Sequence, residues 1–191
     1  MRKLKLQVQI SVDGFIESRD GEVDWLVWNW DNKAWTWDDA LKAYINELTD
    51  SSDTIILGRK MTEGFISHWA NVTPGDPPYP FAMKMLEKRK IVFTKTLNKS
   101  KWENTVLAKG DLVDEINKLK NQQGKDIIVY GGATFDSSLI KAGLIDEFYL
   151  FVNPSPLGNG LSIFEGRQDL KLVESISFNC GIVLLHYIPK R

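Results

Sequence analysis

The fold of this chain is decided by the stretch Ile127-Ile128-Val129-Tyr130-Gly131-Gly132-Ala133-Thr134-Phe135. Its continuous apolar half predicts a buried strand, and the two glycines precede residues that can begin a helix. Glycine lets an anion approach the backbone, and the first turn of a helix offers free N–H groups and a favourable dipole. The stretch therefore predicts a strand, a turn and a helix that suit a pyrophosphate. A tight turn that needs glycine only for its dihedral angles is the alternative.

Two further strand ends carry groups that favour a phosphate. The segment Leu57-Gly58-Arg59-Lys60-Met61-Thr62-Glu63 predicts a strand, a glycine and a helix start with two cations, which can pair with a phosphate monoester. The segment Phe93-Thr94-Lys95-Thr96 places two hydroxyls and a cation at another strand end. In an open α/β sheet the carboxyl ends of the strands share one edge, where ligands bind. Three such ends predict a dinucleotide with an extra phosphate, which indicates NADPH rather than NADH.

The remaining segments predict an α/β fold with a mostly parallel, mixed sheet and helices on both faces. Apolar and polar residues alternate over 4–12, which predicts a first strand that ends at Asp13-Gly14. Short strands are expected at 54–57, 91–94, 126–130 and 147–152, and helices at 33–48, 59–67, 81–90, 111–123 and after Gly132. Segments 170–178 and 181–188 predict an antiparallel hairpin at the sheet edge. With no linker or repeat in the sequence, we expect a single domain over residues 1–191.

Composition argues against several classes of protein. The chain has 191 residues, 43% of them hydrophobic, and a net charge of -1, which disfavours disorder and nucleic-acid binding. Its single cysteine, Cys180, rules out an internal disulfide and a cysteine-based zinc site, and His68 and His186 lack metal-ligand spacing. No apolar run reaches the roughly 20 residues of a membrane helix. We therefore expect a cytoplasmic protein without a metal, a nucleic acid or a membrane as partner.

The most individual feature of the sequence is a tryptophan-rich segment. It contains Trp25, Trp28, Trp30, Trp35 and Trp37, interleaved with aspartates. The segment follows the carboxyl end of the first strand, so it can form a lid and an aromatic slot for a flat heterocycle. Packing on the sheet edge, or contact with a second copy in a homodimer, is the alternative. Trp28 is the residue of this segment that we expect to touch the substrate.

Several motifs resemble dihydrofolate reductase. They are Ser11-Val12-Asp13-Gly14-Phe15-Ile16, Gly58-Arg59-Lys60 and Val129-Tyr130-Gly131-Gly132. The later stretch Gly143-Leu144-Ile145-Asp146-Glu147-Phe148, with Pro154, Gly158, Gly160 and Phe164, is more similar to the reductase domain of the bifunctional riboflavin-biosynthesis deaminase/reductase. The resemblance covers nearly the whole chain and implies a stand-alone member of this family. It implies a dihydrofolate-reductase-like, three-layer α/β/α fold and an NADPH-dependent reduction.

The resemblance also implies roles for particular residues. The pyrophosphate would lie on Gly131, Gly132, Ala133, Thr134 and Phe135, near the nicotinamide, and Tyr130 would border the substrate. Arg59, with Thr94 and Lys95, would face the adenosine 2′-phosphate, and Trp25 would lie on the cofactor side. The start of the helix that carries Arg59 would add Gly58, Lys60 and Met61. Met61 stands where dihydrofolate reductases have threonine.

The substrate implied by the resemblance is a small, heterocyclic molecule with a C=N or C=O bond, reduced as by 5-amino-6-(5-phosphoribosylamino)uracil reductase. Dihydrofolate reductases carry a buried carboxylate on the first helix to protonate the pterin. Asp38 and Asp39 are the candidates for this role, although both lie farther from Gly58 than the family pattern has it. Two alternatives stay open: a nucleotide- or ligand-binding module without catalysis, and dihydrofolate reductase itself.

Overall fold

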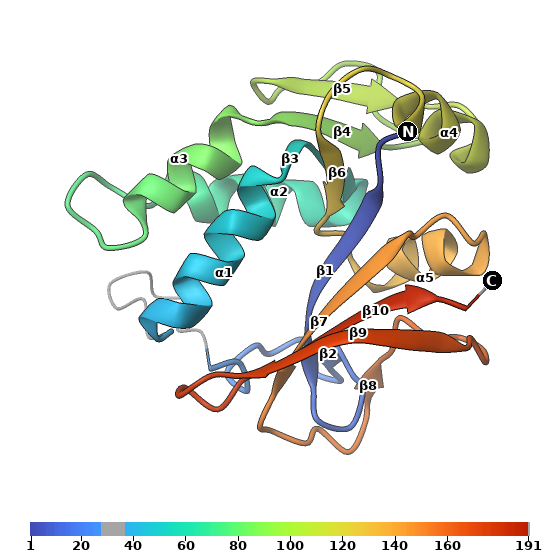
Figure 1. The fold of residues 1–191 in the computed structure, drawn as a ribbon. Coiled ribbons are helices and arrows are strands. Elements are labelled where there is room, and N and C mark those ends of the chain that lie inside the picture. The colour runs from blue at the N-terminus through green and yellow to red at the C-terminus, as the bar shows by residue number, and fades with distance from the viewer. Residues whose placement is uncertain (28–36, 191) are drawn as a thin grey trace.

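A single large sheet forms the centre of the computed structural model, which describes residues 1–27 and 37–190 (Figure 1). In this part of the chain, eight strands follow the order β5-β4-β3-β6-β1-β7-β10-β9. Their bounds are Thr105–Ala108 (β5), Arg89–Phe93 (β4), Ser52–Gly58 (β3), Asp126–Val129 (β6), Leu4–Ser11 (β1), Glu147–Asn153 (β7), Val183–Pro189 (β10) and Leu170–Ser177 (β9). A small separate sheet pairs β2 (Glu17–Ser18) with β8 (Gly160–Leu161).

The large sheet is parallel from β5 to β7 and antiparallel at its last two strands. At the centre, β1 pairs in parallel with β6 and β7. The terminal strand β10 pairs antiparallel with both β7 and β9. The turn between β9 and β10 contains Gly181 with a φ of 94°, a conformation that favours glycine. The predicted mixed sheet with a C-terminal antiparallel hairpin is confirmed.

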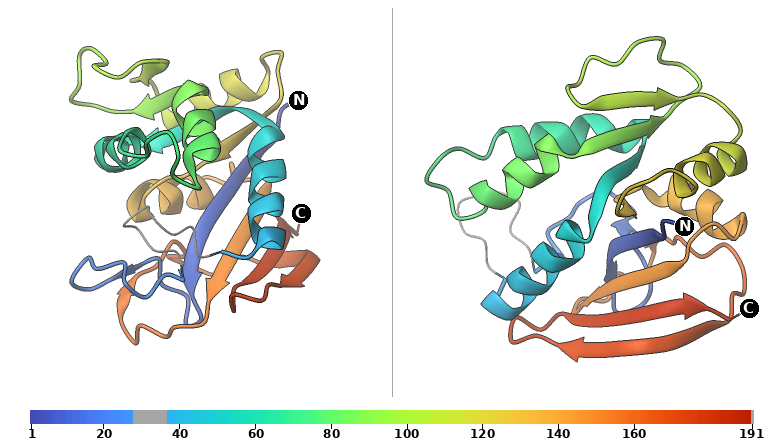
Figure 2. Two further views of the ribbon diagram at one scale, coloured as in Figure 1. Left: turned by 90° about the vertical axis from the view of Figure 1, so that its left-hand side faces the viewer. Right: turned by 45° about the horizontal axis from the view of Figure 1, so that its top comes forward.

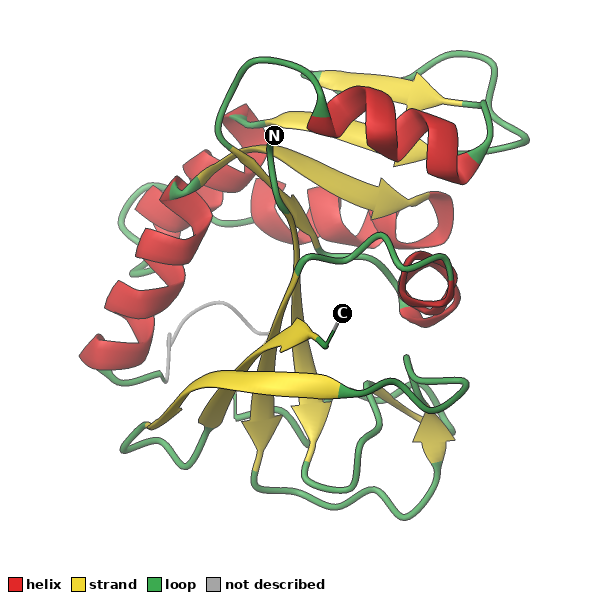
Figure 3. Cartoon of the chain, turned by 45° about the vertical axis from the view of Figure 1, so that its right-hand side comes forward, coloured by secondary structure: helices red, strands yellow, loops and turns green. Residues whose placement is uncertain are grey.

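Helices cover both faces of the sheet, and each face has its own apolar core. The helices are α1 (Asp39–Asp50), α2 (Arg59–Ala70), α3 (Tyr79–Glu87), α4 (Leu112–Lys120) and α5 (Ala133–Lys141). One core joins α1, α2 and α3 to the sheet through residues such as Ile45, Phe65 and Met85, and the other joins α4 and α5 through Ile116 and Leu139. Figure 1, the right-hand view of Figure 2 and Figure 3 show the two groups of helices on opposite sides of the strands. None of the helices in the described residues is long and apolar enough to cross a membrane.

The carboxyl ends of the parallel strands bring the starts of α2 and α5 together. The centres of β3 and β6 are fully buried, as expected for parallel strands covered on both faces. The backbone N–H of Gly58, at the end of β3, donates to the carbonyl of Gly131 at 3.4 Å. A Cβ on Gly58 would lie only 3.0 Å from the Cβ of Phe135. The missing side chain at Gly58 therefore allows the two helix starts to approach closely.

Some elements differ from the sequence expectations for local physical reasons. The first helix begins at Asp39, later than expected, because Asp38 has an extended backbone and caps the helix by accepting from the Leu41 N–H. The helix α3 begins at Tyr79, earlier than expected, because Pro80 suits a first turn where its missing N–H is not needed. The strand β5 is not apparent from the sequence because it is an edge strand of four residues.

Candidate functional site

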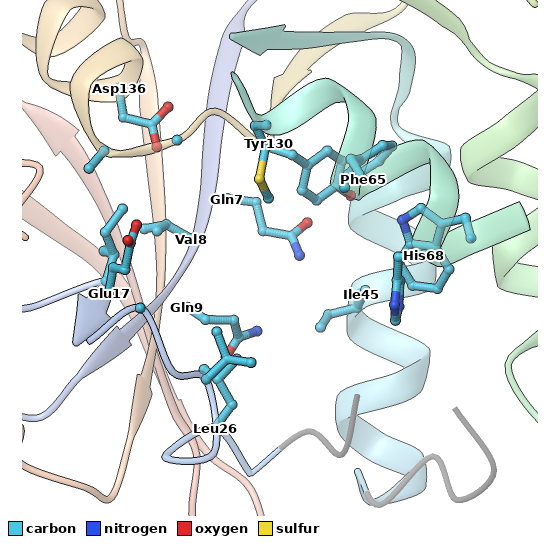
Figure 4. A pocket seen from close by; sticks show the side chains of 18 of the residues that line it. Gln7, Val8, Gln9, Glu17, Leu26, Ile45, Phe65, His68, Tyr130 and Asp136 are labelled. Atoms are coloured by element: carbon cyan, nitrogen blue, oxygen red, sulfur yellow. The ribbon is translucent and has the colours of Figure 1, made fainter. Parts of the chain in front are cut away.

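A cavity of about 570 Å³ lies between β1, α1, α2 and the start of α5 (Figure 4). Apolar and aromatic side chains form most of its wall, with a few polar groups among them, as is typical of sites for small molecules. The lining residues are Gln7, Val8, Gln9, Ile16, Glu17, Gly21, Val23, Leu26, Trp37, Ile45, Met61, Gly64, Phe65, His68, Trp69, Phe81, Tyr130, Gly132, Ala133 and Asp136.

The two glycines after β6 have different roles at the cavity. Gly132 has a φ of 113°, and a Cβ on it would have only the Cβ of Met61 nearby, at 3.6 Å. It is also the N-cap of α5, so no side chain caps the first N–H groups of that helix. At Gly131, in contrast, a Cβ would lie 1.5 Å from Oδ1 of Asp136. Gly132 therefore leaves an open cradle at a helix start, whereas Gly131 makes room for the Asp136 carboxyl.

The start of α2 presents the two predicted cations on the surface. Arg59 and Lys60 are exposed in the first turn, directly after Gly58, and Met61 lines the cavity. The hydroxyl of Thr62 donates to the Gly58 carbonyl at 3.0 Å and is fully buried, so it is used within the helix. An exposed cation pair at a helix start can bind an anion.

The third predicted strand end lies apart from the cavity wall. Thr94 is buried, and its hydroxyl oxygen accepts from the backbone N–H groups of Thr96 and Leu97 at 3.2 and 3.1 Å. Lys95 is exposed beside it. Neither residue lines the cavity. The hydroxyl of Thr94 thus shapes its own turn, and Lys95 is the group of this strand end that is open to an anion.

Aromatic rings form the wall of the cavity opposite β1. The rings of Phe65 and Tyr130 lie 5.5 Å apart, and Trp69 contacts both Phe65 and Phe81 edge to face, at 6.3 and 5.3 Å. Tyr130 lines the cavity beside the turn into α5, and its expected contact with the substrate stays a prediction. Its hydroxyl is 3.3 Å from Oγ1 of Thr49, and burial raises the pKa of the phenol, which keeps it neutral. This wall suits the face of a flat ring.

Three titratable residues of the wall, Glu17, His68 and Asp136, were not predicted as site residues. Asp136 is 2% exposed, and burial raises the pKa of its carboxyl to about 7, although a backbone hydrogen bond from Gly132 opposes this shift. Burial lowers the pKa of His68 to about 4, so its ring is neutral at pH 7. The sequence signal for Asp136 is its place one turn after Gly132, on a helix that starts at the cavity. Among the described residues, no cluster of histidine, cysteine and acidic groups could hold a metal.

The predicted acids on the first helix are placed differently. One carboxylate oxygen of Asp38 accepts from the Leu41 N–H at 2.9 Å and the other from the Cys180 N–H at 3.1 Å. These hydrogen bonds lower the pKa of Asp38. Asp39 is fully exposed and lies 3.5 Å from Nζ of Lys42. Because neither residue lines the cavity, the structure gives neither a path to a ligand there, and Asp38 instead ties α1 to the β9–β10 turn.

The structure describes two tryptophans of the tryptophan-rich segment, Trp25 and Trp37, and they differ in their place. Trp37 is 3% exposed and lines the cavity. Trp25 is 8% exposed and does not line the cavity, and its expected place on the cofactor side stays a prediction. The expected contact of Trp28 with the substrate lies outside the described residues, as do Trp30 and Trp35.

Comparison with known proteins shows the family and the fold of the chain. Residues 2–184 match the family described as the RibD C-terminal domain. The uncharacterized protein YyaP of Bacillus subtilis (strain 168) is 33% identical over 193 residues, which cover 97% of this chain and 94% of that protein. A protein of Shewanella sp. PV-4, provisionally named a riboflavin biosynthesis protein, has a TM-score of 0.73 at 22% identity over the whole of both chains.

The fold also matches the Thermotoga maritima diaminohydroxyphosphoribosylaminopyrimidine deaminase/5-amino-6-(5-phosphoribosylamino)uracil reductase. The TM-score is 0.68 at 18% identity, and the match covers 99% of this chain and 57% of that chain. The resemblance drawn from the sequence motifs is therefore confirmed. The chain belongs to the RibD C-terminal domain family, a family of NAD(P)H-using reductases with a dihydrofolate-reductase-like fold.

Proposed function

We propose that this protein is an NADPH-dependent reductase that transfers a hydride to a C=N or C=O bond of a small, flat heterocycle similar to 5-amino-6-(5-phosphoribosylamino)uracil. One observation carries this proposal. The same cavity joins the open backbone cradle at Gly132 to the aromatic wall of Phe65, Trp69 and Tyr130. Such a cavity can take the nicotinamide end of a reducing cofactor beside a flat ring, with the rest of the cofactor outside it at the exposed helix starts.

The residues at the helix starts fit a dinucleotide phosphate. The cradle at Gly132, with the first N–H groups of α5 at Ala133 and Thr134, would hold the pyrophosphate, whereas the N–H of Phe135 already donates to the Gly132 carbonyl at 2.9 Å. Arg59 and Lys60, together with Lys95, would meet the 2′-phosphate that distinguishes NADPH from NADH. When bound, NADPH supplies the hydride, and the protein supplies position and electrostatics.

The residues of the wall would orient the substrate and exclude water. Phe65, Trp69 and Tyr130 offer flat faces for a ring. Gln7 is buried at 9% exposure, and its Oε1 has no hydrogen-bond partner among the described residues, so it can accept from a ring N–H. Its neighbour Gln9 already accepts from Nδ2 of Asn153 at 2.8 Å. Because the wall is apolar, each hydrogen bond made inside it discriminates strongly between ligands.

Calorimetry and turnover together test this function. Native protein is titrated with NADPH and with NADH, and the loss of NADPH absorbance is then followed with 5-amino-6-(5-phosphoribosylamino)uracil and with dihydrofolate. The proposal expects preferential NADPH binding and oxidation with the ribosylaminouracil. NADPH binding without oxidation by any carbonyl or imine would favour a binding module. Oxidation by dihydrofolate alone, with tight antifolate binding, would favour dihydrofolate reductase. A protein that binds neither cofactor would contradict the proposal.

A further inference from the structure

Asp136 is a buried carboxylic acid in the wall of the cavity. It lies one turn into α5, and only 2% of its surface is exposed. Its Oδ1 atom has no hydrogen-bond partner among the described residues. Figure 4 shows the side chain on the α5 side of the cavity, across from His68 on α2. A buried polar atom without a partner is rare in folded proteins, because it loses its hydration without compensation, and a ligand that enters the cavity can supply the missing partner.

The backbone turn before α5 leaves space for this carboxyl. A Cβ at residue 131 would lie 1.5 Å from Oδ1 of Asp136, so only glycine at that position leaves room for the side chain. A capping role alone does not explain the arrangement, because Oδ1 receives no N–H from the start of α5. The pair of Gly131 and Asp136 therefore places an acid directly beside the turn that borders the cofactor cradle.

The surroundings of Asp136 favour its protonated form. The other titratable residues of the cavity wall are Glu17 on β2, His68 on α2 and Tyr130 after β6. None of the ion pairs in the described residues involves Asp136, and the cations Arg59 and Lys60 lie exposed at the start of α2. Burial raises the pKa of Asp136 to about 7. A large share of the molecules thus carries an O–H donor at this site at neutral pH.

Among the titratable groups of the wall, Asp136 also has the pKa best suited to a general acid at neutral pH. Burial raises the pKa of Tyr130, which makes its phenol a weak acid, and burial lowers the pKa of His68 to about 4, so its ring rarely carries the extra proton at pH 7. Glu17 is exposed to water. A general acid works best when its pKa is near the working pH, which among these groups fits Asp136.

We propose that Asp136 is a catalytic residue that donates the proton to the substrate nitrogen or oxygen during the reduction. This inference rests on the proposed reductase function. The substrate carbon gains the hydride, and the electron pair of the C=N or C=O bond moves to the nitrogen or oxygen. That atom takes the proton from Asp136, and the resulting carboxylate takes a proton from water before the next turnover. One hydride and one proton are consumed for each bond reduced.

The variant Asp136→Asn tests the donor role, because asparagine has nearly the same shape and no acidic proton. In single-turnover mixing of NADPH-loaded protein with 5-amino-6-(5-phosphoribosylamino)uracil, the rate of NADPH oxidation should fall about 100-fold or more. The affinity for NADPH, measured by calorimetry, should change little. Asp114→Asn, which removes an exposed carboxyl from the first turn of α4, is the matched control and should leave the rate unchanged. Circular dichroism checks that both variants are folded.

A second measurement does not depend on turnover. Carbon-13 NMR of the aspartate carboxyls in ligand-free native protein should show one group that titrates near pH 7 and that is missing from Asp136→Asn. In the native enzyme the single-turnover rate should fall as the pH rises through this value, because the donor loses its proton, and the residual rate of the variant should lack this step.

The outcomes separate the two proposals. Native protein that oxidises no NADPH with this substrate would refute the proposed function, and the donor role with it. A fast Asp136→Asn variant would overturn the donor role alone. So would a carboxyl that titrates near the ordinary aspartate value, because Asp136 would then hold no proton at neutral pH.

Discussion

Replacing Asp136 with Asn should make the ligand-free protein more stable, and the gain should grow with pH. Asp136 is 2% exposed, and burial raises the pKa of its carboxyl from 3.8 to about 7. When this carboxyl ionises in the folded state, its charge is cut off from water. The unfolded chain has no such penalty. Asparagine removes the charge and keeps the shape, so it should remove the penalty.

The size of the effect follows from the two pKa values. The folded pKa is raised, so the folded state holds the proton more tightly, and stability falls as the pH rises from the unfolded value through the folded value. Each unit of difference is worth about 1.4 kcal/mol. For the two values of Asp136, the penalty is about 2 kcal/mol at pH 5 and about 4 kcal/mol at pH 8. The stabilisation by Asp136→Asn should therefore be about 2–3 kcal/mol larger at the higher pH.

Urea unfolding followed by circular dichroism, on native and variant protein at both pH values, measures this difference. Other titrating groups are common to both proteins, so their effects cancel when native and variant protein are compared at one pH. Any pH-independent cost of burying the asparagine amide cancels when the two pH values are compared. Asp114→Asn, which changes an exposed carboxyl, should show nearly the same effect at both pH values. A gain from Asp136→Asn that is equal at pH 5 and pH 8 would refute the reasoning, since Asp136 would then titrate alike in the folded and unfolded states.

Three further variants test the cofactor site. Arg59→Ala should weaken NADPH binding about tenfold and leave NADH binding nearly unchanged, because one charge-assisted contact with the 2′-phosphate is lost. Calorimetry with both cofactors measures the two affinities, and an equal loss of affinity for both would contradict the 2′-phosphate contact. Gly132→Val should abolish NADPH binding in a folded protein, because the new side chain fills the cradle and strains a backbone with a φ of 113°. Calorimetric titration measures the loss of binding, and circular dichroism checks that the variant is folded. Trp25→Ala should lower the free energy of unfolding by about 3–5 kcal/mol, because Trp25 is buried, and a variant as stable as native protein would contradict this. Weakened NADPH binding in this variant would support the predicted place of Trp25 on the cofactor side, and unchanged NADPH affinity would remove Trp25 from the cofactor site.

The sequence by itself determined the elements whose signals are local. The continuous apolar runs at 55–57 and 127–129 lie in the buried parallel strands β3 and β6, and the pattern around Gly181 becomes the terminal hairpin. The glycine turn into α5 was also visible, because a positive φ and a helix start have recognisable residue preferences. Periodicity and turn chemistry depend only on neighbouring residues, and together with the family motifs they were enough for the fold class.

Only the tertiary structure decided what the side chains do. Asp38 and Asp136 are both aspartates near helix starts. The pKa of Asp38 is lowered by N–H groups that include that of Cys180, far along the chain, whereas burial in the cavity wall raises the pKa of Asp136. Trp25 and Trp37 belong to one tryptophan-rich segment, yet Trp37 lines the cavity and Trp25 does not. The physical reason is that burial and hydrogen bonding depend on elements that are distant in sequence, so the pKa of a carboxyl or the exposure of a ring is set only when those elements pack together.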